Sequence, residues 1–181
     1  MILEKPIILD ACCIINILAS GRIEDIISNL PVDIFISETV KRDEILNIEH
    51  LEELNPPNKK FMDVLGNNTL KVVNFKNDIE MGRFIFYVME IGDDGEAASL
   101  AIAEERNFIL ATDDKNAIKI ANRYAKNVPI ISTLELIKTW SEIQRPTKNC
   151  LQNMLKNIKE YGKYFPGDKH PLKQWWDFYI L

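Results

Sequence analysis

GDDGEAASLAIAEERNFILATDDKNA, residues Gly92–Ala117, is the segment whose pattern indicates the fold most clearly. It begins with a helical pattern over Glu96–Arg106, which is rich in alanine and has apolar residues at helical spacing. Asp94 and Gly95 before it form a start signal for that helix. A short apolar run, Phe108–Ala111, follows and is typical of a buried strand. The segment therefore predicts a helix that leads directly into a strand, as in α/β proteins.

Four further apolar runs have the length and composition of strands. They are Pro6–Leu9, Val32–Ile36, Leu70–Phe75 and Val128–Ile131. Helical patterns lie between them, and parallel strands need such long connections. The alternation predicts a three-layer α/β/α sandwich with a mostly parallel central sheet of about five strands. Ligands of such sheets bind at the carboxyl ends of the strands.

One domain with a C-terminal extension is the organisation that the sequence predicts. A chain of 181 residues, of which 46% are hydrophobic, can bury a core and is of ordinary single-domain length. We expect an α/β domain over residues 1–144 and an extension over residues 145–181 that packs on or near it. The extension should begin with a helix from about Lys148 to Tyr161. The aromatic, irregular segment Gly162–Leu181 is expected to pack back onto the domain, with a partner interface or base stacking as the alternative.

No segment is typical of a membrane span or of a secretory signal. The apolar run IILDACCIINIL near the start is interrupted by Asp10 and is shorter than the ~20 residues that cross a bilayer. The first residues also lack the basic region and small-residue cleavage site of a secretory signal. We therefore expect a cytoplasmic protein with no membrane partner.

Cysteine and histidine offer little chemistry in this chain. Cys12 and Cys13 are adjacent and Cys150 is remote, so neither a C-x-x-C zinc motif nor a disulfide framework is present in the sequence. His50 and His170 are the two histidines, so the sequence offers few candidates for a nucleophilic site in which a histidine is the base. Carboxylates must carry the chemistry.

The charge is distributed unevenly, although the net charge is −5. Between Arg145 and Lys173, seven Lys and Arg face two acids, which gives this stretch a charge near +5. The remainder has 15 basic and 25 acidic residues and is near −10. An acidic body that binds divalent cations, joined to a basic extension, is compatible with a metal-dependent nuclease and equally with an ordinary solvated surface.

Acidic residues directly follow two of the predicted strands. Asp10 comes after Ile7–Leu9, and the pair Asp113 and Asp114 comes after Phe108–Ala111 and one threonine. Because the carboxyl ends of parallel strands meet at one edge of a sheet, these carboxylates are expected to converge. Each also has a purely structural interpretation, since Asp is a common N-cap of the helix that follows it.

Two further acids lie on helices beside this edge. Glu44 lies in the helical segment Thr39–Asn47 after the second strand, with Asp43 as its alternative. Glu96 opens the helix before the fourth strand, with Asp94 as an alternative. The structural interpretations are a solvated surface acid for the first and compensation of the helix dipole for the second.

The set as a whole suits a divalent metal. Mg²⁺ prefers oxygen ligands in octahedral geometry at about 2.0–2.1 Å and keeps several waters. Two such ions about 3.5–4 Å apart can stabilise both the attacking and the leaving oxygen of a phosphoryl displacement. The sequence leaves open whether one or two ions bind.

Four segments, in this order and spacing, resemble the successive motifs of PIN domains. They are LDACCIINIL, VKRDEIL, GDDGEAASLAIA and FILATDDKNA, and the resemblance covers roughly residues 6–142. It implies a PIN-like α/β/α fold and Mg²⁺- or Mn²⁺-dependent ribonuclease activity. The catalytic residues that it implies are Asp10, Glu44, Glu96 and Asp114. The metal ligands that it implies are Asp10, Glu96 and Asp114, with Asp113 as a supporting neighbour.

The resemblance also implies partners. RNA would be the substrate, and similarity to toxin-type PIN ribonucleases suggests a cognate antitoxin and a homodimer. One position departs from the family pattern, because Cys12 stands where PIN domains often have Ser, Thr or Asn. The loss of that hydroxyl would weaken the support of the metal site. The alternative function is therefore a catalytically inactive, PIN-like RNA-binding or regulatory module.

Overall fold

The centre of the computed structural model, which describes residues 3–44 and 57–180, is a sheet of five parallel strands. The strands are β1 (Ile7–Leu9), β2 (Ile34–Ser37), β3 (Leu70–Val73), β4 (Ile109–Ala111) and β5 (Ile130–Ile131). Their order across the sheet is β3-β2-β1-β4-β5, and each neighbouring pair is parallel. Each strand overlaps its predicted run, and the predicted parallel sheet is confirmed.

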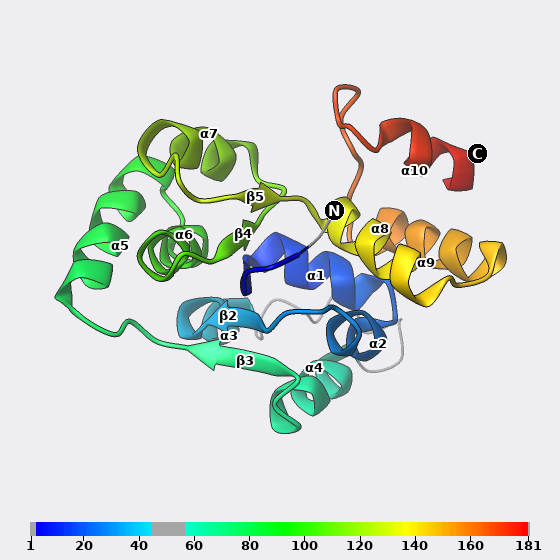
Figure 1. Ribbon diagram of the computed structural model, residues 1–181, viewed down its shortest axis with the longest axis horizontal. Coiled ribbons are helices and arrows are strands. Elements are labelled where there is room, and N and C mark those ends of the chain that lie inside the picture. Colours follow the sequence, from blue (N-terminus) through cyan, green and yellow to red (C-terminus); the bar gives the residue numbers. More distant parts are fainter. Residues whose placement is uncertain (1–2, 45–56, 181) are drawn as a thin grey trace.

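The strands are apolar because the sheet is covered on both faces. In β1, Ile7 and Leu9 belong to one buried cluster and Ile8 belongs to the other. All three side chains are at most 1% exposed. Two cores therefore lie on opposite faces of one sheet, and the predicted three-layer sandwich is confirmed (Figure 1).

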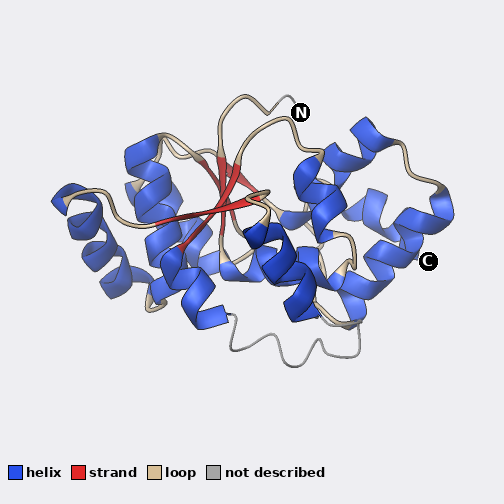
Figure 2. Cartoon of the chain, turned by 90° about the horizontal axis from the view of Figure 1, so that it is seen from below, coloured by secondary structure: helices blue, strands red, loops and turns tan. Residues whose placement is uncertain are grey.

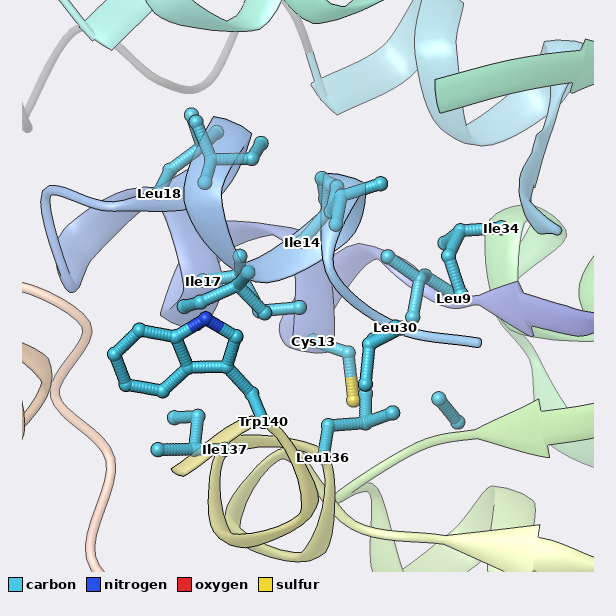
Figure 3. Packing of buried hydrophobic residues seen from close by; sticks show 14 of the residues in the cluster. Leu9, Cys13, Ile14, Ile17, Leu18, Leu30, Ile34, Leu136, Ile137 and Trp140 are labelled. Carbon is cyan, nitrogen blue, oxygen red and sulfur yellow. The ribbon is translucent and has the colours of Figure 1, made fainter. Parts of the chain in front are cut away.

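The larger core lies between the sheet and a group of helices from both ends of the chain. These are α1 (Ala11–Ala19), α2 (Ile23–Ser28), α4 (Pro57–Gly66), α8 (Thr133–Gln144) and α9 (Lys148–Glu160). Figure 3 shows Ile14 and Ile17 of α1 and Ile137 and Trp140 of α8 pointing into this core. The helix that follows β1 is therefore held against helices that follow β5.

The second core is covered by α5 (Asp78–Ile91), α6 (Asp94–Arg106) and α7 (Lys115–Tyr124), and Figure 2 shows helices on both sides of the strands. Helix α6 packs against both β1 and β2, and its buried face is rich in alanine, which allows close approach to the sheet. It begins two residues before the predicted start because the Asp93 side chain accepts a hydrogen bond from the Glu96 amide and caps it. Helix α3 (Glu38–Glu44) follows β2 and packs against α6.

The C-terminal extension is more regular than the sequence indicates. The segment predicted to be irregular contains a helix, α10 (Lys173–Ile180), which packs against α9. Its anchor is Trp176, whose side chain is fully buried in the larger core. Trp176 and Ile180 are one turn apart on this helix, and Leu172, which directly precedes it, continues the same apolar stripe, which explains why the helix forms. Within residues 3–44 and 57–180, no helix has the length and apolar character needed to cross a membrane.

Candidate functional site

The strand order creates a crevice at the carboxyl ends of β1 and β4. From β1 the chain proceeds to β2 on one side, whereas from β4 it proceeds to β5 on the other side. Adjacent strands whose connections diverge in this way leave a topological switch point, where ligands of open α/β sheets bind. Asp10 lies there after β1, and its amide donates a hydrogen bond to the Ala111 carbonyl at 3.1 Å. Asp113 and Asp114 follow β4 at the same edge.

Asp10 is buried and held at several points. Its side chain is the N-cap of α1 and accepts a hydrogen bond from the Cys13 amide at 2.9 Å. The Cys12 thiol donates to both carboxylate oxygens, with Sγ to oxygen distances of 3.0 and 3.2 Å. Cys12 thus supplies the hydrogen bond that a hydroxyl at this position would make. The N-cap interpretation of Asp10 is confirmed, and this role leaves the carboxylate at the sheet edge where the site prediction places it.

Asp113 lies beside Asp10 and is held by residues of two helices. Its Oδ2 accepts a hydrogen bond from the Asn16 side-chain amide of α1 at 3.3 Å. Its Oδ1 accepts from the Thr133 amide, at the start of α8, also at 3.3 Å. The Cys13 thiol lies 3.7 Å from Oδ2. These contacts make α1, the end of β4 and the start of α8 one hydrogen-bonded unit.

Burial makes ionisation of both carboxylates unfavourable. It raises the pKa of Asp10 to about 6, although hydrogen bonds from Thr112, Cys12 and Cys13 oppose this and the charge of Asp113 adds to it. Burial also raises the pKa of Asp113, against the hydrogen bonds from Thr133 and Asn16. Among the described residues, neither carboxylate forms an ion pair with a basic side chain.

A pocket of about 440 Å³ opens beside this pair. The residues that line it are Cys12, Ile15, Asn16, Glu96, Asp113, Asp114, Gly162, Lys163 and Tyr164. Asp114 caps α7 by accepting a hydrogen bond from the Ala117 amide at 2.7 Å. Glu96 is half-buried in the first turn of α6. The structure therefore brings Glu96, Asp113 and Asp114 to one pocket, with Asp10 joined to it through Cys12.

Glu44 is the last residue of α3, and its side chain lies outside the described part of the structure, as does that of its alternative, Asp43. The predicted end of this helix, residues 45–47, lies outside it too. Val40, one turn before Glu44, lies against the start of α6, because a Cβ added to Gly95 would be 3.3 Å from Val40 Cγ2. The backbone of α3 is thus beside the helix that carries Glu96.

Several residues of the site are not evident from the sequence motifs. Asn16 is 3% exposed and also donates to the Thr133 hydroxyl at 3.3 Å. A single Asn within the apolar run of α1 is the signal that points to it. Lys163 and Tyr164 come from the C-terminal extension, and no local pattern places them at the pocket. The Tyr164 hydroxyl is buried and has no hydrogen-bond partner among the described residues, while burial and the nearby charge of Asp113 raise its pKa.

The donor set at the end of β1 has the dimensions of a metal site. Asp10, Cys12 and Cys13 each offer one ligand atom, and these three atoms lie within 4.8 Å of one another. This spacing is close enough for the three atoms to contact the same ion. Burial raises the pKa of Cys13 well above its usual value. The Cys12 pKa is also raised, because burial and the charges of the two aspartates outweigh its hydrogen bond with Cys13. Both sulfurs are therefore thiols that donate hydrogen bonds, and Asp10 is the one member of this set left as a ligand of a hard cation. Further oxygen ligands would come from the acids that line the adjacent pocket.

Comparison with known proteins assigns the family. A family model described as a PIN domain matches residues 6–166. The chain belongs to the PIN-domain family. PIN domains are generally nucleases, so the fold implies nucleic-acid binding, and they bind divalent metals. No curated protein matches the chain.

The matched range extends beyond the motifs that carry the resemblance in sequence. It passes Glu142, includes α9 and ends at Pro166, so it contains Lys163 and Tyr164. The part of the C-terminal extension that reaches the pocket is therefore within the PIN-domain match, whereas α10 follows it.

Proposed function

We propose that this PIN domain is a metal-dependent ribonuclease that hydrolyses RNA phosphodiester bonds with Mg²⁺ or Mn²⁺. The observation that carries the proposal is a pair of carboxylates at the switch point of the sheet: Asp10, which is buried, and Asp113, which is half-buried. Both have raised pKa values and neither has a basic partner among the described residues. Two adjacent acids that are wholly or partly removed from water are costly to ionise unless a cation offsets their charges.

The residues present fit a hard divalent cation. Asp10, Glu96 and Asp114 are the proposed ligands, with Asp113 as a supporting ligand. Asp113 shares the pocket with Glu96 and Asp114. Oxygen ligands are those that Mg²⁺ and Mn²⁺ prefer. When bound, the cation would offset the negative charge that develops on the phosphate during displacement.

The chain's own residues position the reaction. Cys12 fixes the orientation of the Asp10 carboxylate through two hydrogen bonds. Asn16 and Thr133 do the same for Asp113. These are the outer contacts that hold metal ligands in place and that strongly affect metal affinity. We propose that a water molecule is the attacking group and that Glu44 assists by ligation or by orienting that water.

A cleavage assay separates this proposal from an inactive RNA-binding module. Purified protein is incubated with labelled structured RNA and with single-stranded DNA, in Mg²⁺, in Mn²⁺ and in EDTA. The proposal expects RNA cleavage in Mg²⁺ or Mn²⁺, loss of cleavage in EDTA and loss in Asp10→Asn. Asp63→Asn, an exposed acid of α4, is the matched control and should cleave like wild type. RNA binding without cleavage in any metal would favour the inactive module.

The biological setting is a further part of the proposal. We propose that the chain is the toxin of a toxin–antitoxin pair, acting in the cytoplasm as a homodimer with a cognate antitoxin. Induced expression of the wild type should then arrest growth, and Asp10→Asn should not. Normal growth during expression of a cleavage-competent wild type would contradict the toxin role and leave the ribonuclease intact.

A further inference from the structure

A glycine of the C-terminal extension, Gly162, lies directly against Asn16 of the site. A Cβ added to Gly162 would lie 2.6 Å from the Asn16 side-chain oxygen and 2.8 Å from the Ile158 carbonyl. These distances are shorter than real Cβ contacts, so only glycine fits between α1 and the end of α9. The close approach fixes the position of the next two residues, Lys163 and Tyr164, which line the acidic pocket.

The backbone around Lys163 is held on both sides. Lys163 has a φ of 54°, in the left-handed region that is unfavourable for a residue with a side chain. The Tyr164 amide donates to the Ile158 carbonyl at 3.3 Å, which closes the turn after α9. Further along, His170 accepts a hydrogen bond from the Leu172 amide through Nδ1 and therefore donates from Nε2 to the Ser132 hydroxyl. The segment is thus tied to α8 as well.

Lys163 also lines a second hollow, of about 450 Å³, on the outer side of α9. The other residues that line it are Lys156, Lys159, Glu160 and Ile180. Lys156 and Lys159 are neighbours on the helix surface because they are three residues apart. All three lysines are exposed, and none of them forms a salt bridge with a carboxylate of the described residues.

Lys163 lines both hollows, so the acidic surface and the basic surface adjoin at this residue. The acidic pocket by itself repels a phosphodiester, and a strand that enters it needs positive charge on the adjacent surface. Lysine binds phosphate as a compact point charge without base recognition, as a sequence-independent contact to a strand requires. Three lysines in a row match a flexible chain that carries one negative charge at every nucleotide.

We propose that Lys163, Lys159 and Lys156 bind successive phosphates of the RNA strand next to the scissile bond. The proposal rests on the ribonuclease function proposed above and names the path by which its substrate leaves the acidic pocket. Lys163 contacts the phosphate nearest to the cleavage site, because it lines that pocket itself. Lys159 and Lys156 follow along α9. None of the three residues carries the chemistry of cleavage; they position the strand.

The direct test measures binding of the full chain to a short single-stranded RNA in EDTA, by fluorescence anisotropy at several salt concentrations. Each of Lys163→Gln, Lys159→Gln and Lys156→Gln should weaken binding by about fivefold. Each should also reduce the slope of log affinity against log salt by about 0.7, the value for one phosphate contact of a single strand. Lys163→Arg keeps the charge and should bind within about twofold of wild type.

Lys126→Gln is the matched control, because Lys126 is exposed after α7 and lines neither hollow. It should leave affinity and salt slope unchanged. A triple variant that binds RNA with the affinity and salt slope of wild type would overturn the proposal. All substituted side chains are exposed, and a thermal unfolding curve that matches wild type shows that the fold is retained.

Cleavage kinetics add a second readout. Lys159→Gln and Lys156→Gln should raise KM and leave kcat unchanged, whereas Lys163→Gln should also lower kcat because it misplaces the phosphate at the pocket. Faster cleavage by Lys163→Gln would overturn the proposal, since it would make this lysine an inhibitor that neutralises the acids. Binding in EDTA needs no turnover. A wild type that binds through these lysines but never cleaves would therefore refute the ribonuclease and retain the strand path.

Discussion

The side-chain amide of Asn16 donates a hydrogen bond to the Asp113 carboxylate, with 3.3 Å between Nδ2 and Oδ2. The two residues are 97 positions apart, and their contact joins the helix after β1 to the acid after β4. The same amide reaches the Thr133 hydroxyl. Asn16 therefore connects α1, the end of β4 and the start of α8 beside the carboxylates of Asp10 and Asp113.

Replacement of Asn16 by alanine should destabilise the protein and impair the site. The variant removes the Asn16 amide as hydrogen-bond donor to Asp113 Oδ2 and to the Thr133 hydroxyl, which should lower the free energy of unfolding by about 1–3 kcal/mol. Urea denaturation measures this loss. Asn153→Ala, on the exposed side of α9, is the control and should change stability by less than about 0.5 kcal/mol. Equal free energies of unfolding for the two variants would show that the hydrogen bonds of Asn16 do not stabilise the fold.

Stability of the metal-free protein should depend on pH through Asp10. Its pKa is raised in the folded state from 3.8 to about 6, so the folded state binds a proton more tightly than the unfolded state. The free energy of unfolding should therefore fall as pH rises from about 4 to about 6, by at most about 3 kcal/mol from this group.

Asp10→Asn isolates that contribution, because it removes the titrating group and keeps the side chain's shape. In EDTA, the wild type should lose stability relative to Asp10→Asn between pH 4 and pH 6, and the difference should be constant above pH 7. Chemical denaturation at each pH measures it. If the difference in free energy of unfolding between the two proteins stays constant from pH 4 to pH 6, burial does not raise the pKa of Asp10 in the folded state.

Divalent metal should stabilise the wild type through the same carboxylates. At a concentration 100 times its Kd, an ion that binds only the folded state adds about 2.7 kcal/mol. A thermal scan with and without Mn²⁺ should show a higher Tm for wild type and for Asp63→Asn, and a much smaller rise for Asp10→Asn. Equal rises in all three proteins would place the ion elsewhere.

Addition of a single methyl group should disconnect the extension from the site. Gly162→Ala places a Cβ against the Asn16 oxygen and the Ile158 carbonyl, so the backbone must shift, at a cost of about 1–3 kcal/mol. The shift moves Lys163 and Tyr164, and kcat/KM for RNA should fall. Gly167→Ala is the control, because no atom of the described residues lies within 4 Å of its added Cβ. A Gly162→Ala variant as stable and active as the control would show that the close approach is not needed.

Local sequence is enough to predict most of the sheet and the acidic residues at its carboxyl edge. The strands are short apolar runs, and an acid that directly follows a buried strand is confined to the sheet's carboxyl edge, so the positions of Asp10 and Asp113 can be predicted. The bounds of α5 are harder to predict, because Ile79, Ile85 and Met89 are apolar but exposed. They interrupt the regular alternation of apolar and polar residues by which a helix is recognised.

Long-range packing determines the rest of the site. Lys163 reaches the pocket only because α9 packs against α1, and no local pattern contains that contact. Sequence favours Asp114 over Asp113 as the main ligand, by resemblance alone. In the structure Asp114 caps α7, while Asp113 bonds to Asn16 and Thr133, a difference that depends on the approach of α1 and α8.

The cleavage rate of a labelled RNA by wild type and by Asp10→Asn, each measured in Mn²⁺ and in EDTA, decides whether this site is a ribonuclease centre. The ribonuclease proposal predicts cleavage by wild type in Mn²⁺ alone, with the variant folded and inactive. Cleavage by Asp10→Asn at the wild-type rate would contradict the proposed site. Absence of cleavage by a wild type that binds both RNA and Mn²⁺ would contradict the proposed activity.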